Sequence, residues 1–420
     1  MRESRRRHLE ALPGSGRKRG SNVAEQTAAG TGADAPVGSQ AAPPSFQKPQ
    51  NKIVIVNMDY TLLVSMVLLV LIGIVMVYSA SYYVASTSAR FGYDMFTLVR
   101  SQIMAALIGF AALIVMSNFN YHKYLRKFTV PAYIGALALL ILTVFIGDEA
   151  GGAQRWLNLF GFRFQPSEVA KIAVIMTMAH LIAFNKKMAD DFRGIAVLGI
   201  FIGIMAALIG FGTNNMSSAI IITIIGFGTI FVASKMTWPF VVAGAAAASG
   251  LAFILATGVG FRAGRFAAWL DPFADPTDTG FQIIQSLFAI GSGGMFGLGL
   301  GQSRQKLGFI PEAHNDIIFS VIAEELGFMG ATLVLFLFGV YLWRAIKIAL
   351  NAKDTYGCLL AVGAALMVGS QAIINIAVVT NSIPNTGVPL PFISHGGTSL
   401  LVMMTATGIL LNISRYQNRN

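Results

Sequence analysis

The sequence predicts an all-α, polytopic membrane protein with about ten transmembrane helices. Of its 420 residues, 55% are hydrophobic and only 12% are charged. Soluble domains carry roughly 25% charged residues, so this balance excludes an ordinary soluble enzyme. The mean hydropathy is +0.65. The apolar residues are gathered in runs of ~20, which is the length that a helix needs to cross a bilayer.

Ten such runs follow Asp59. The fifth and the sixth are short and are separated by the polar residues 212–215, so nine crossings is the alternative if this pair forms a hairpin that does not cross. The single Cys358 excludes a disulfide framework and a cysteine-rich metal site. We expect the spans near residues 60–80, 98–117, 128–147, 167–184, 194–212, 216–233, 238–257, 316–342, 357–380 and 396–414.

The amino-terminal residues 1–51 differ from the rest of the chain. They are rich in Gly, Ser, Ala, Pro, Gln and Arg and contain no apolar run that could form a core, so we expect a disordered, basic cytoplasmic tail. Its two arginine-rich clusters either contact the anionic cytoplasmic leaflet or form a solvated arm that helps to set the topology. The membrane domain is then 52–415, and residues 416–420 form a second cytoplasmic tail.

Lysine and arginine set the expected orientation. With the amino terminus inside, twelve of them fall in the inner loops and the carboxyl tail, and nine fall on the outer side, which contains far more loop sequence. The density of positive charge therefore favours both termini in the cytoplasm. The longest outer segment, 258–315, lies between the seventh and eighth spans and is long enough to be functional. Within it we expect a short amphipathic helix near residues 280–290.

The large outer loop is rich in glycine at residues 291–294 and again at Gly297, Gly299 and Gly301. A nucleotide-binding loop would need a preceding strand, a following helix and usually Gly-Lys-Ser/Thr. The sequence has none of these features, so we interpret the glycines as a flexible loop with close backbone packing.

The end of this loop places Glu312, His314 and Asp316 within five residues, just before the eighth span. Asp316 would lie in the first turn of that helix. A carboxylate there either caps the helix dipole or acts as a general base at the membrane surface. From these residues alone the two roles are equal alternatives. The three side chains could also bind a divalent cation, although their spacing fits no strong ligand signature.

Charged residues inside the spans need partners, because a carboxylate in a membrane helix costs ~2.5 kcal/mol or more. Glu324 and Glu325 lie within the eighth span, and we expect them to make interhelical hydrogen bonds rather than to act in catalysis. Glu168 and Lys171 lie three residues apart at the start of the fourth span, hence on one helix face. Either they form a self-satisfied pair, or Lys171 reaches a carboxylate on another helix, for which Asp316 is the best candidate by depth.

Two further outer segments carry candidate binding residues. Arg155 and Trp156 precede the fourth span, where they are either an interfacial anchor or a contact to an anionic, lipid-borne substrate. The last outer loop, residues 385–399, is rich in proline and glycine, and it either lines a site or forms a re-entrant turn. Ser394 and His395 in this loop are candidate contacts, although a histidine at such a place is more often a hydrogen-bonded packing residue.

These stretches, in this order, resemble the SEDS family (shape, elongation, division and sporulation) of peptidoglycan polymerases. The resemblance covers about residues 55–415, and the family's ten spans, cytoplasmic termini and large outer loop match the expectations above. Pro-Glu-Ala-His at 311–314 and the long tail resemble FtsW, the division branch, more than RodA. The matching motifs are Gly-Ala-Gln-Arg-Trp at 152–156, Gln-Pro-Ser-Glu-Val-Ala-Lys at 165–171, Gln-Ile-Ile-Gln-Ser at 282–286, Ala-Ile-Gly-Ser-Gly-Gly at 289–294, Gln-Lys-Leu-Gly-Phe-Ile-Pro-Glu-Ala-His at 305–314, Ala-Glu-Glu-Leu-Gly-Phe at 323–328 and Pro-Leu-Pro-Phe-Ile-Ser at 389–394.

The resemblance implies a glycosyltransferase that polymerises lipid II on the outer face of the cytoplasmic (inner) membrane during division, with undecaprenyl diphosphate as the leaving group. It implies that Asp316 is the catalytic general base and that Lys171 lies near it, so Asp316 and Lys171 are the two catalytic candidates. Protein cations, or a bound divalent ion as the one candidate cofactor, would stabilise the diphosphate. The substrate-binding candidates are Arg155, Trp156, Glu168, Arg262, Arg265, Lys306, Glu312, His314, Ser394 and His395.

The resemblance also implies partners at the division septum. These are a class B penicillin-binding protein, which is a transpeptidase, and other membrane proteins of the division machinery, with no nucleic acid. A lipid II flippase is the competing function, but a transporter needs alternating access and ideally an internal repeat, and we find no convincing repeat. A non-catalytic scaffold that recruits the transpeptidase is a third hypothesis, and it predicts that Asp316 is dispensable.

At three positions this sequence departs from the family pattern, which limits the residue roles that can be transferred from the family to this chain. Many relatives have an acidic residue in the stretch that here reads Thr-Asn-Asn-Met-Ser-Ser-Ala at 213–219, so no role is transferred to Asn215. His395 stands where many relatives have tyrosine, so no role of a tyrosine hydroxyl is transferred. Asn315 replaces the usual threonine before Asp316 and leaves the acid in place.

Overall fold

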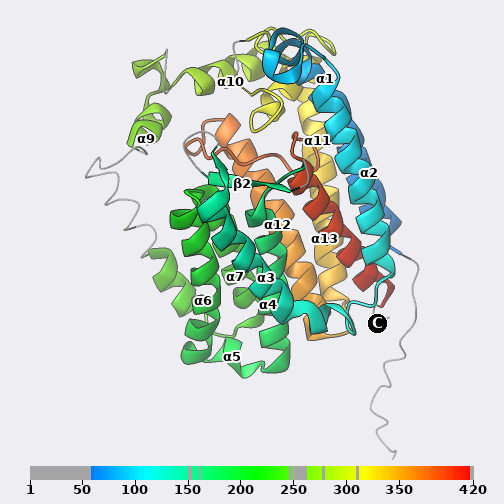
Figure 1. Ribbon diagram of the computed structural model, residues 1–420, viewed down its shortest axis with the longest axis vertical. Helices are drawn as coiled ribbons and strands as arrows, with labels where there is room; N and C mark the ends of the chain where they lie inside the picture. The colour runs from blue at the N-terminus through cyan, green and yellow to red at the C-terminus, as the bar shows by residue number, and fades with distance from the viewer. Residues whose placement is uncertain are drawn as a thin grey trace, which may run out of the picture. The chain divides into compact units, whose positions relative to one another are not determined.

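The computed structural model describes residues 58–149, 154–159, 162–245, 249, 263–276, 280–308 and 312–416. These residues are mostly helical (Figure 1), which confirms the predicted fold class. Nine of the described helices are long and apolar enough to cross a membrane. They are α1 (Tyr60–Thr87), α2 (Thr97–Asn118), α3 (Leu125–Ile146), α4 (Pro166–Phe184), α6 (Phe192–Ala207, continued by a π-helical turn to Gly212), α7 (Met216–Ala233), α11 (Ile318–Leu350), α12 (Thr355–Val379) and α13 (Gly397–Arg415).

Shorter helices join the long ones. The expected amphipathic helix of the large loop is present as α10 (Phe281–Ser292), which buries Ile283 and Ile284 and leaves Phe288 exposed. The tail, residues 1–51, lies outside the described residues, as does Arg262. The other short helices are α5 (Lys187–Asp190), α9 (Ala263–Leu270) and the 3₁₀ turns Ala89–Phe91 and Pro272–Ala274.

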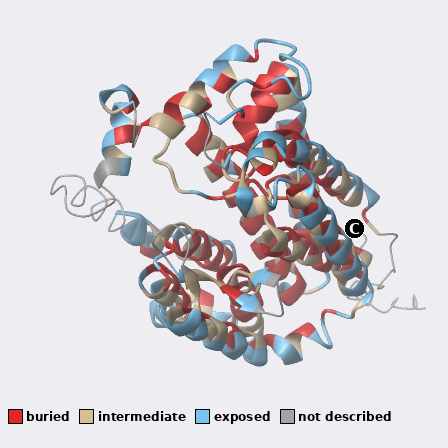
Figure 2. Cartoon of the chain, turned by 45° about the horizontal axis from the view of Figure 1, so that its top comes forward, coloured by how far each residue is buried: buried red, intermediate tan, exposed pale blue. Residues whose placement is uncertain are grey.

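Helices α4, α12 and α13 form the centre of the described helices. The apolar windows of these three are 67%, 67% and 78% buried, whereas those of the other six are 28–44% buried. Figure 2 shows buried residues gathered in the interior of the bundle and exposed residues on its outside. Glycine allows the close approach, because a Cβ added to Gly363 of α12 would lie 2.6 Å from Cγ2 of Ile175 on α4. Small residues at helix contacts are a common feature of membrane bundles.

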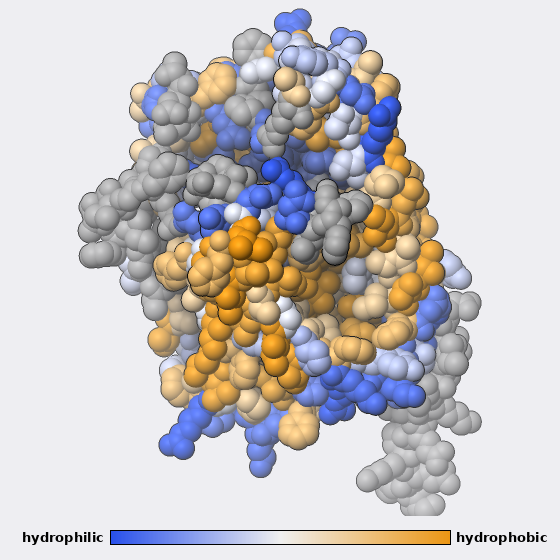
Figure 3. Space-filling view, viewed as in Figure 1, coloured by the Kyte–Doolittle hydropathy of each residue, from blue (hydrophilic) through white to orange (hydrophobic). Residues whose placement is uncertain are grey.

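The outer helices present apolar side chains where a soluble protein would present polar ones. On α3, Ile134 is 59% exposed and Phe145 is 76% exposed. Figure 3 shows the resulting hydrophobic band, with hydrophilic residues above and below it. A helix that is apolar on its exposed side as well as on its buried side is typical of a membrane span.

Both ends of the described chain meet at one end of the bundle. The Asp59 carboxylate lies 2.6 Å from Nη2 of Arg344 on α11, and the backbone N–H of Asp59 donates to Ser414 Oγ of α13 at 3.2 Å. The carboxylate also caps α1 by accepting from the N–H of Leu62. The start of α1 is thereby tied to α11 and α13. We call this the Asp59 end, and the other one the Asp316 end.

The chain changes ends between Lys235 and Ala263. After α7, the N–H of Lys235 donates to Asp190 Oδ1 at 3.0 Å, at the Asp59 end. Helix α9 is held at the Asp316 end, where Trp269 Nε1 donates to Asn381 O at 3.1 Å. The tenth span that the sequence predicts falls in this interval and stays a prediction. Residues 238–245 are helical, and most of the remaining residues of the expected span 238–257 lie outside the described ranges.

The segment before α4 forms a small antiparallel sheet, although the sequence predicted only a loop. Strand β2 (Gln154–Leu159) pairs with β1 (Asp148–Glu149) on one side and with β3 (Phe162–Phe164) on the other. Trp156 lies opposite Asp148 in the first pair. Strands β1 and β3 are too short to give a periodic signal, and the sequence of β2 does not alternate between apolar and polar residues.

Helix α11 is interrupted at Gly327, whose φ is 68° and ψ is −167°. An unbroken helix would bond the N–H groups after the break to the carbonyls before it. Instead, residues 294–299 of the large loop fill the gap and bond to both sides. The four hydrogen bonds are Phe328 N to Gly294 O at 2.8 Å, Met329 N to Met295 O at 3.1 Å, Leu298 N to Glu324 O at 2.9 Å and Gly299 N to Glu325 O at 3.0 Å. Two N–H groups and two carbonyls beside the break thus bond to the loop, as the bilayer interior requires.

The glycines of the loop allow this contact. A Cβ on Gly293 would lie 1.9 Å from Ala323 O, and a Cβ on Gly297 would lie 2.1 Å from Glu325 O. Such distances are well inside van der Waals contact, so only glycine fits. The predicted close backbone packing is confirmed at Gly293 and Gly297, whereas a Cβ on Gly291, Gly294 or Gly301 would meet nothing within 4 Å.

Replacing Gly327 with alanine should destabilise the protein. The φ/ψ region of Gly327 is nearly restricted to glycine and costs a side-chain-bearing residue about 1–3 kcal/mol, and the new Cβ would lie 2.2 Å from Gly297 N. Thermal unfolding of Gly327→Ala in detergent should show a clearly lower midpoint. The matched control is Gly339→Ala in the same helix, where an added Cβ meets nothing within 4 Å. Equal midpoints for the two variants would contradict this account of the break.

Candidate functional site

The residues before α11 form a compact turn that presents Asp316. Glu312 adopts a left-handed conformation with φ 51°, and its carbonyl accepts from the N–H of Asn315 at 2.8 Å. Its exposed side chain accepts from Asn315 Nδ2 at 3.0 Å. Asp316 itself is partly buried. The turn therefore separates an exposed carboxylate from a shielded one four residues later.

The last outer loop holds this turn by its backbone. Ser394 Oγ donates to Asn315 O at 2.5 Å, and the N–H of His395 donates to His314 O at 3.0 Å. From α12, Asn375 Nδ2 donates both to Asp316 O at 2.6 Å and to Val388 O at 2.7 Å. Three successive carbonyls of the turn are thus fixed, and the predicted residues of both loops come together.

The environment of Asp316 raises the pKa of its carboxyl group to about 6. Burial is the main cause, because it disfavours the charged form, and the nearby Glu312 carboxylate raises the pKa further. A hydrogen bond with the residue's own backbone N–H and the Arg265 guanidinium act in the opposite direction. The backbone of Gly387 lies against the carboxylate, since a Cβ added there would be 3.6 Å from Asp316 Oδ2.

The hydrogen bonds at the start of α11 distinguish between the two roles considered for Asp316, a helix cap and a general base. The residue that caps α11 is Ile317, and no side chain bonds to the helix there. The Asp316 carboxylate is therefore not used as a cap. A shielded carboxyl group whose pKa lies near neutrality has the properties of a general base.

Lys171 forms the self-satisfied pair rather than a bond to Asp316. Its ammonium lies 2.7 Å from Glu168 Oε1 and donates to Gln371 Oε1 of α12 at 3.2 Å. All of Lys171 and nearly all of Glu168 are buried. The prediction that Lys171 pairs directly with Asp316 is wrong. The link is indirect, because Gln371 lies one helical turn from Asn375, which holds the Asp316 carbonyl.

Several polar atoms around this region have no hydrogen-bond partner among the described residues. They include Glu168 Oε2, Asn375 Oδ1 and His395 Nε2, all shielded from solvent. Buried polar atoms are nearly always paired. A polar substrate or ordered water is the ordinary partner for such a group, so these three atoms are candidate contacts for one.

His314 and His395 lie together beside the turn. Their ring centroids are 5.6 Å apart in an edge-on arrangement. Burial and the neighbouring His314 lower the pKa of His395 to about 4, so its imidazole is neutral at physiological pH. No group of three or more His, Cys, Asp or Glu side chains among the described residues is placed to hold a metal ion. Glu312, His314 and Asp316 therefore do not form the divalent-cation site considered from the sequence.

The two described arginines that the sequence names as substrate-binding candidates, Arg155 and Arg265, lie on separate elements. Arg155 of β2 donates to Asn214 O at 3.0 Å, which ties the sheet to the start of α7. Arg265 lies on the exposed side of α9, and its charge reaches Asp316. Trp269 and Asn381 hold α9 in place by bonding to each other's backbone carbonyls at 3.1 and 3.2 Å.

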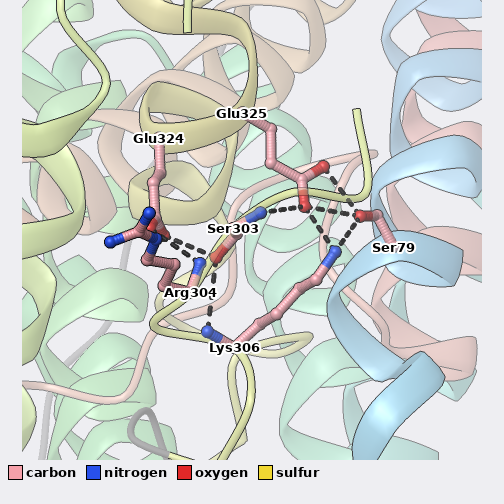
Figure 4. Close-up of polar contacts among 6 residues, drawn as sticks. All are labelled: Ser79, Ser303, Arg304, Lys306, Glu324 and Glu325. Atoms are coloured by element: carbon pink, nitrogen blue, oxygen red, sulfur yellow. Dashed lines mark hydrogen bonds and ion pairs between the residues drawn. The ribbon is translucent and has the colours of Figure 1, made fainter. Parts of the chain in front are cut away.

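A buried ionic cluster joins the large loop to α1 and α11 (Figure 4). Lys306 Nζ lies 2.6 Å from Glu325 Oε1 and 2.9 Å from Ser79 Oγ. Ser79 of α1 also donates to the Glu325 carboxylate at 2.7 Å. Lys306 is only 3% exposed. Its ammonium is thus engaged within the protein rather than presented to a substrate, which differs from the role suggested by the sequence.

The same loop also holds Glu324. The carboxylate accepts from Ser303 Oγ at 2.5 Å and from the N–H of Arg304 at 2.9 Å. The prediction that both glutamates make interhelical hydrogen bonds is confirmed for Glu325 and wrong for Glu324. Only Glu325 reaches another helix, through Ser79, since Glu324 bonds to the loop.

The polar residues of α12 were missed in the sequence. Gln371 and Asn375 are four residues apart in an otherwise apolar span, so they share one face of the helix. That spacing was the available signal. Polar side chains inside a membrane helix mark an interior face and often a functional one.

A protein-family model described as "Cell cycle protein", which covers FtsW, RodA and SpoVE, matches residues 60–419. The chain belongs to the FtsW/RodA/SpoVE family. It is 41% identical over 368 residues to stage V sporulation protein E of Bacillus subtilis (strain 168), with 85% of this chain and 97% of that protein covered. It is 40% identical over 363 residues to the probable peptidoglycan glycosyltransferase FtsW of Geobacter sp. (strain M18), with 85% and 96% covered.

Solved structures of the family share the fold. A chain from a peptidoglycan synthase complex that coordinates polymerization and crosslinking is 26% identical, with a TM-score of 0.70 over 86% of this chain and 99% of that one. The rod shape determining protein RodA of Thermus thermophilus is 24% identical, with a TM-score of 0.63 over 86% and 98%. Together with the apolar helices, this membership identifies a multi-pass membrane protein of the FtsW/RodA/SpoVE family.

Breaking the Lys306–Glu325 pair should be costly. Removing one partner of a buried ion pair leaves an unpaired charge and costs about 3–5 kcal/mol. Lys306→Met should therefore lower the thermal midpoint strongly, and Lys306→Met with Glu325→Leu should recover part of the loss. Arg100→Met is the control, because the Arg100–Asp94 pair is 71% and 38% exposed and exposed pairs contribute about 0–1 kcal/mol. A Lys306→Met midpoint equal to that of the control would remove the structural role of the pair.

Proposed function

We propose that this chain is a peptidoglycan glycosyltransferase that polymerises lipid II at the outer surface of the cytoplasmic membrane during cell division. The observation that carries the proposal is Asp316, a shielded carboxyl group whose pKa is raised to about 6. It lies in a turn fixed by two other segments, in a family whose members are named peptidoglycan glycosyltransferases. The Asp316 end then faces outward and the lysine-bearing Asp59 end faces the cytoplasm, as the distribution of charge favours.

In the proposed reaction, the 4-hydroxyl of one lipid-linked disaccharide attacks C1 of the lipid-linked sugar of the other. Asp316 accepts the proton of the attacking hydroxyl as the new glycosidic bond forms. The bond between C1 and the diphosphate oxygen breaks, and undecaprenyl diphosphate leaves with the electron pair. One base and one leaving group on opposite sides of C1 suit a displacement with inversion. The glycosyl diphosphate supplies the driving force.

The negative charge that develops on the departing diphosphate must be stabilised by positive charge. Among the described arginines, Arg265 is the best candidate for this role, because its positive charge already lowers the pKa of Asp316. Arg155 and Trp156 lie on the sheet at the same end. Lys171 and Lys306 are paired inside the protein, so we assign Lys171 to positioning the Gln371 side of α12. Glu168, Glu312, His314, Ser394 and His395 complete the proposed surroundings of the substrate.

We further propose that a transpeptidase of the class B penicillin-binding type partners this chain at the septum, with other division proteins. The support is the relative in a peptidoglycan synthase complex that couples polymerization to crosslinking. A flippase would need no base, and a scaffold would need neither base nor substrate. The reaction catalysed at Asp316 therefore separates the three functions.

Asp316→Asn should abolish glycan synthesis while leaving the fold intact. The amide keeps the shape of the side chain but cannot accept the proton, and loss of a general base typically costs about 10²–10⁴-fold in rate. The measurement is the glycan ladder formed from lipid II by the full-length protein with its partner transpeptidase in detergent. Asp94→Asn is the control, because Asp94 is an exposed aspartate paired with Arg100 away from the turn. Normal ladders from Asp316→Asn would exclude a catalytic role and favour a flippase or scaffold.

The rate of polymerisation should fall as the pH is lowered below about 6. Only the carboxylate accepts a proton, so below the Asp316 pKa of about 6, kcat/KM should fall about tenfold per pH unit. Glu312→Gln removes a charge that raises this pKa and should shift the acid limb to lower pH. Arg265→Gln removes a charge that lowers it and should shift the limb to higher pH. Full pH profiles of both variants test the signs, and an acid limb that stays in place in both would belong to another group.

A further inference from the structure

A cavity of about 420 Å³ opens at the Asp59 end of the bundle, away from Asp316. It lies where α4, α7 and α11 end and where α12 begins. Its walls are about half apolar and half polar, and the apolar half includes Ile182, Val232, Leu350 and Leu359. Lys186, Lys353 and Asp354 supply charge. The proposed polymerisation uses none of these residues.

Aromatic and basic residues on α11 mark the depth of this cavity. The ring of Trp343 lies 5.4 Å from Arg344 Cζ and 5.4 Å from Lys347 Nζ. Tryptophan and basic residues gather at the level of lipid headgroups. Leu350, on the cavity wall, lies ~4.5 Å farther along the helix axis than Lys347. The cavity therefore opens among headgroups rather than in hydrocarbon.

The charge left free in the cavity is positive. Both oxygens of Asp354 are engaged, one by His122 Nδ1 at 2.6 Å and the other by the N–H of Gly357 at 2.7 Å and the hydroxyl of Tyr121 at 3.3 Å. Among the described residues, neither Lys186 nor Lys353 forms an ion pair. The cavity is thus lined by two exposed lysines without an ion pair and by an acid that is already paired.

The helix dipole alone explains why Lys186 and Lys353 are found at this end of the bundle. Lys186 follows the end of α4 and Lys353 follows the end of α11, where a cation complements the helix dipole. That role explains the two charges but not the cavity between them. It also does not explain why the walls continue onto the exposed sides of α7 and α11, where Val232 is 56% exposed and Leu350 is 79% exposed.

We propose that this cavity binds an anionic membrane phospholipid, with the headgroup phosphate between Lys186 and Lys353 and an acyl chain leaving past Val232 and Leu350. A phosphate with an attached apolar chain matches both halves of the lining. Basic pockets between helices on the cytoplasmic side of a membrane protein are known to take such headgroups. The site lies at the opposite end from Asp316, so the proposal does not depend on the proposed catalysis.

The test uses the full-length protein in detergent and native mass spectrometry. Phosphatidylglycerol, phosphatidylcholine and inorganic phosphate are added in separate arms, and the retained adducts are counted. We expect one tightly held phosphatidylglycerol and weaker retention of phosphatidylcholine. Lys186→Gln with Lys353→Gln should weaken phosphatidylglycerol binding by about tenfold or more, since each lysine contributes to anionic-lipid attraction. Lys123→Gln with Lys127→Gln is the matched control, because it removes the same charge at the same end outside the cavity.

A second variant tests the cavity without touching its charge. Ala233→Trp replaces a small residue of the cavity lining with a large one and should expel the lipid while both lysines remain. Thermal unfolding establishes that each variant is folded. Equal lipid loss from the control double variant would reduce the effect to general surface charge and overturn the proposal. Displacement of phosphatidylglycerol by inorganic phosphate alone, or retention of lipid by Ala233→Trp, would also overturn it.

Discussion

One constraint shapes much of this molecule: a backbone polar group inside the bilayer must find its partner within the protein. Helix α11 breaks at Gly327 and would leave two carbonyls and two N–H groups without partners. The large loop supplies all four partners from residues 294–299. The loop is therefore part of the core, and its glycines are fixed by that contact. From there the chain continues to Lys306, which is locked by Glu325, and then to the turn that carries Asp316.

The site is held by backbone contacts, which leaves its side chains available for chemistry. Ser394, His395 and Asn375 bond to the carbonyls of the Asp316 turn and not to its carboxylate. Helix α12 connects the parts, because Asn375 holds the turn and Gln371, one helical turn away, holds Lys171. A carboxyl group in such a frame keeps its position while its protonation changes, which is what a base requires.

The sequence was sufficient for the spans and for the place of Asp316, because long apolar runs and a polar turn before a helix leave strong signals. It could not give the partners of buried charges. Lys171 bonds to Glu168 and Gln371 and not to Asp316, and Lys306 bonds to Glu325. Such choices depend on how each helix is rotated and how deep each residue lies, and hydropathy contains neither quantity. The small sheet was missed for a different reason, since two of its strands are too short to show a period and the sequence of β2 does not alternate.

The bonds from Asp59 to Arg344 and Ser414 have a consequence for labelling experiments. They bring residues 59 and 414 to neighbouring positions although 355 residues separate them in the chain. Two probes attached just outside α1 and α13 would therefore begin side by side in one compartment. Such a pair would detect a molecule that binds at the Asp59 end. It would leave the Asp316 end unobstructed.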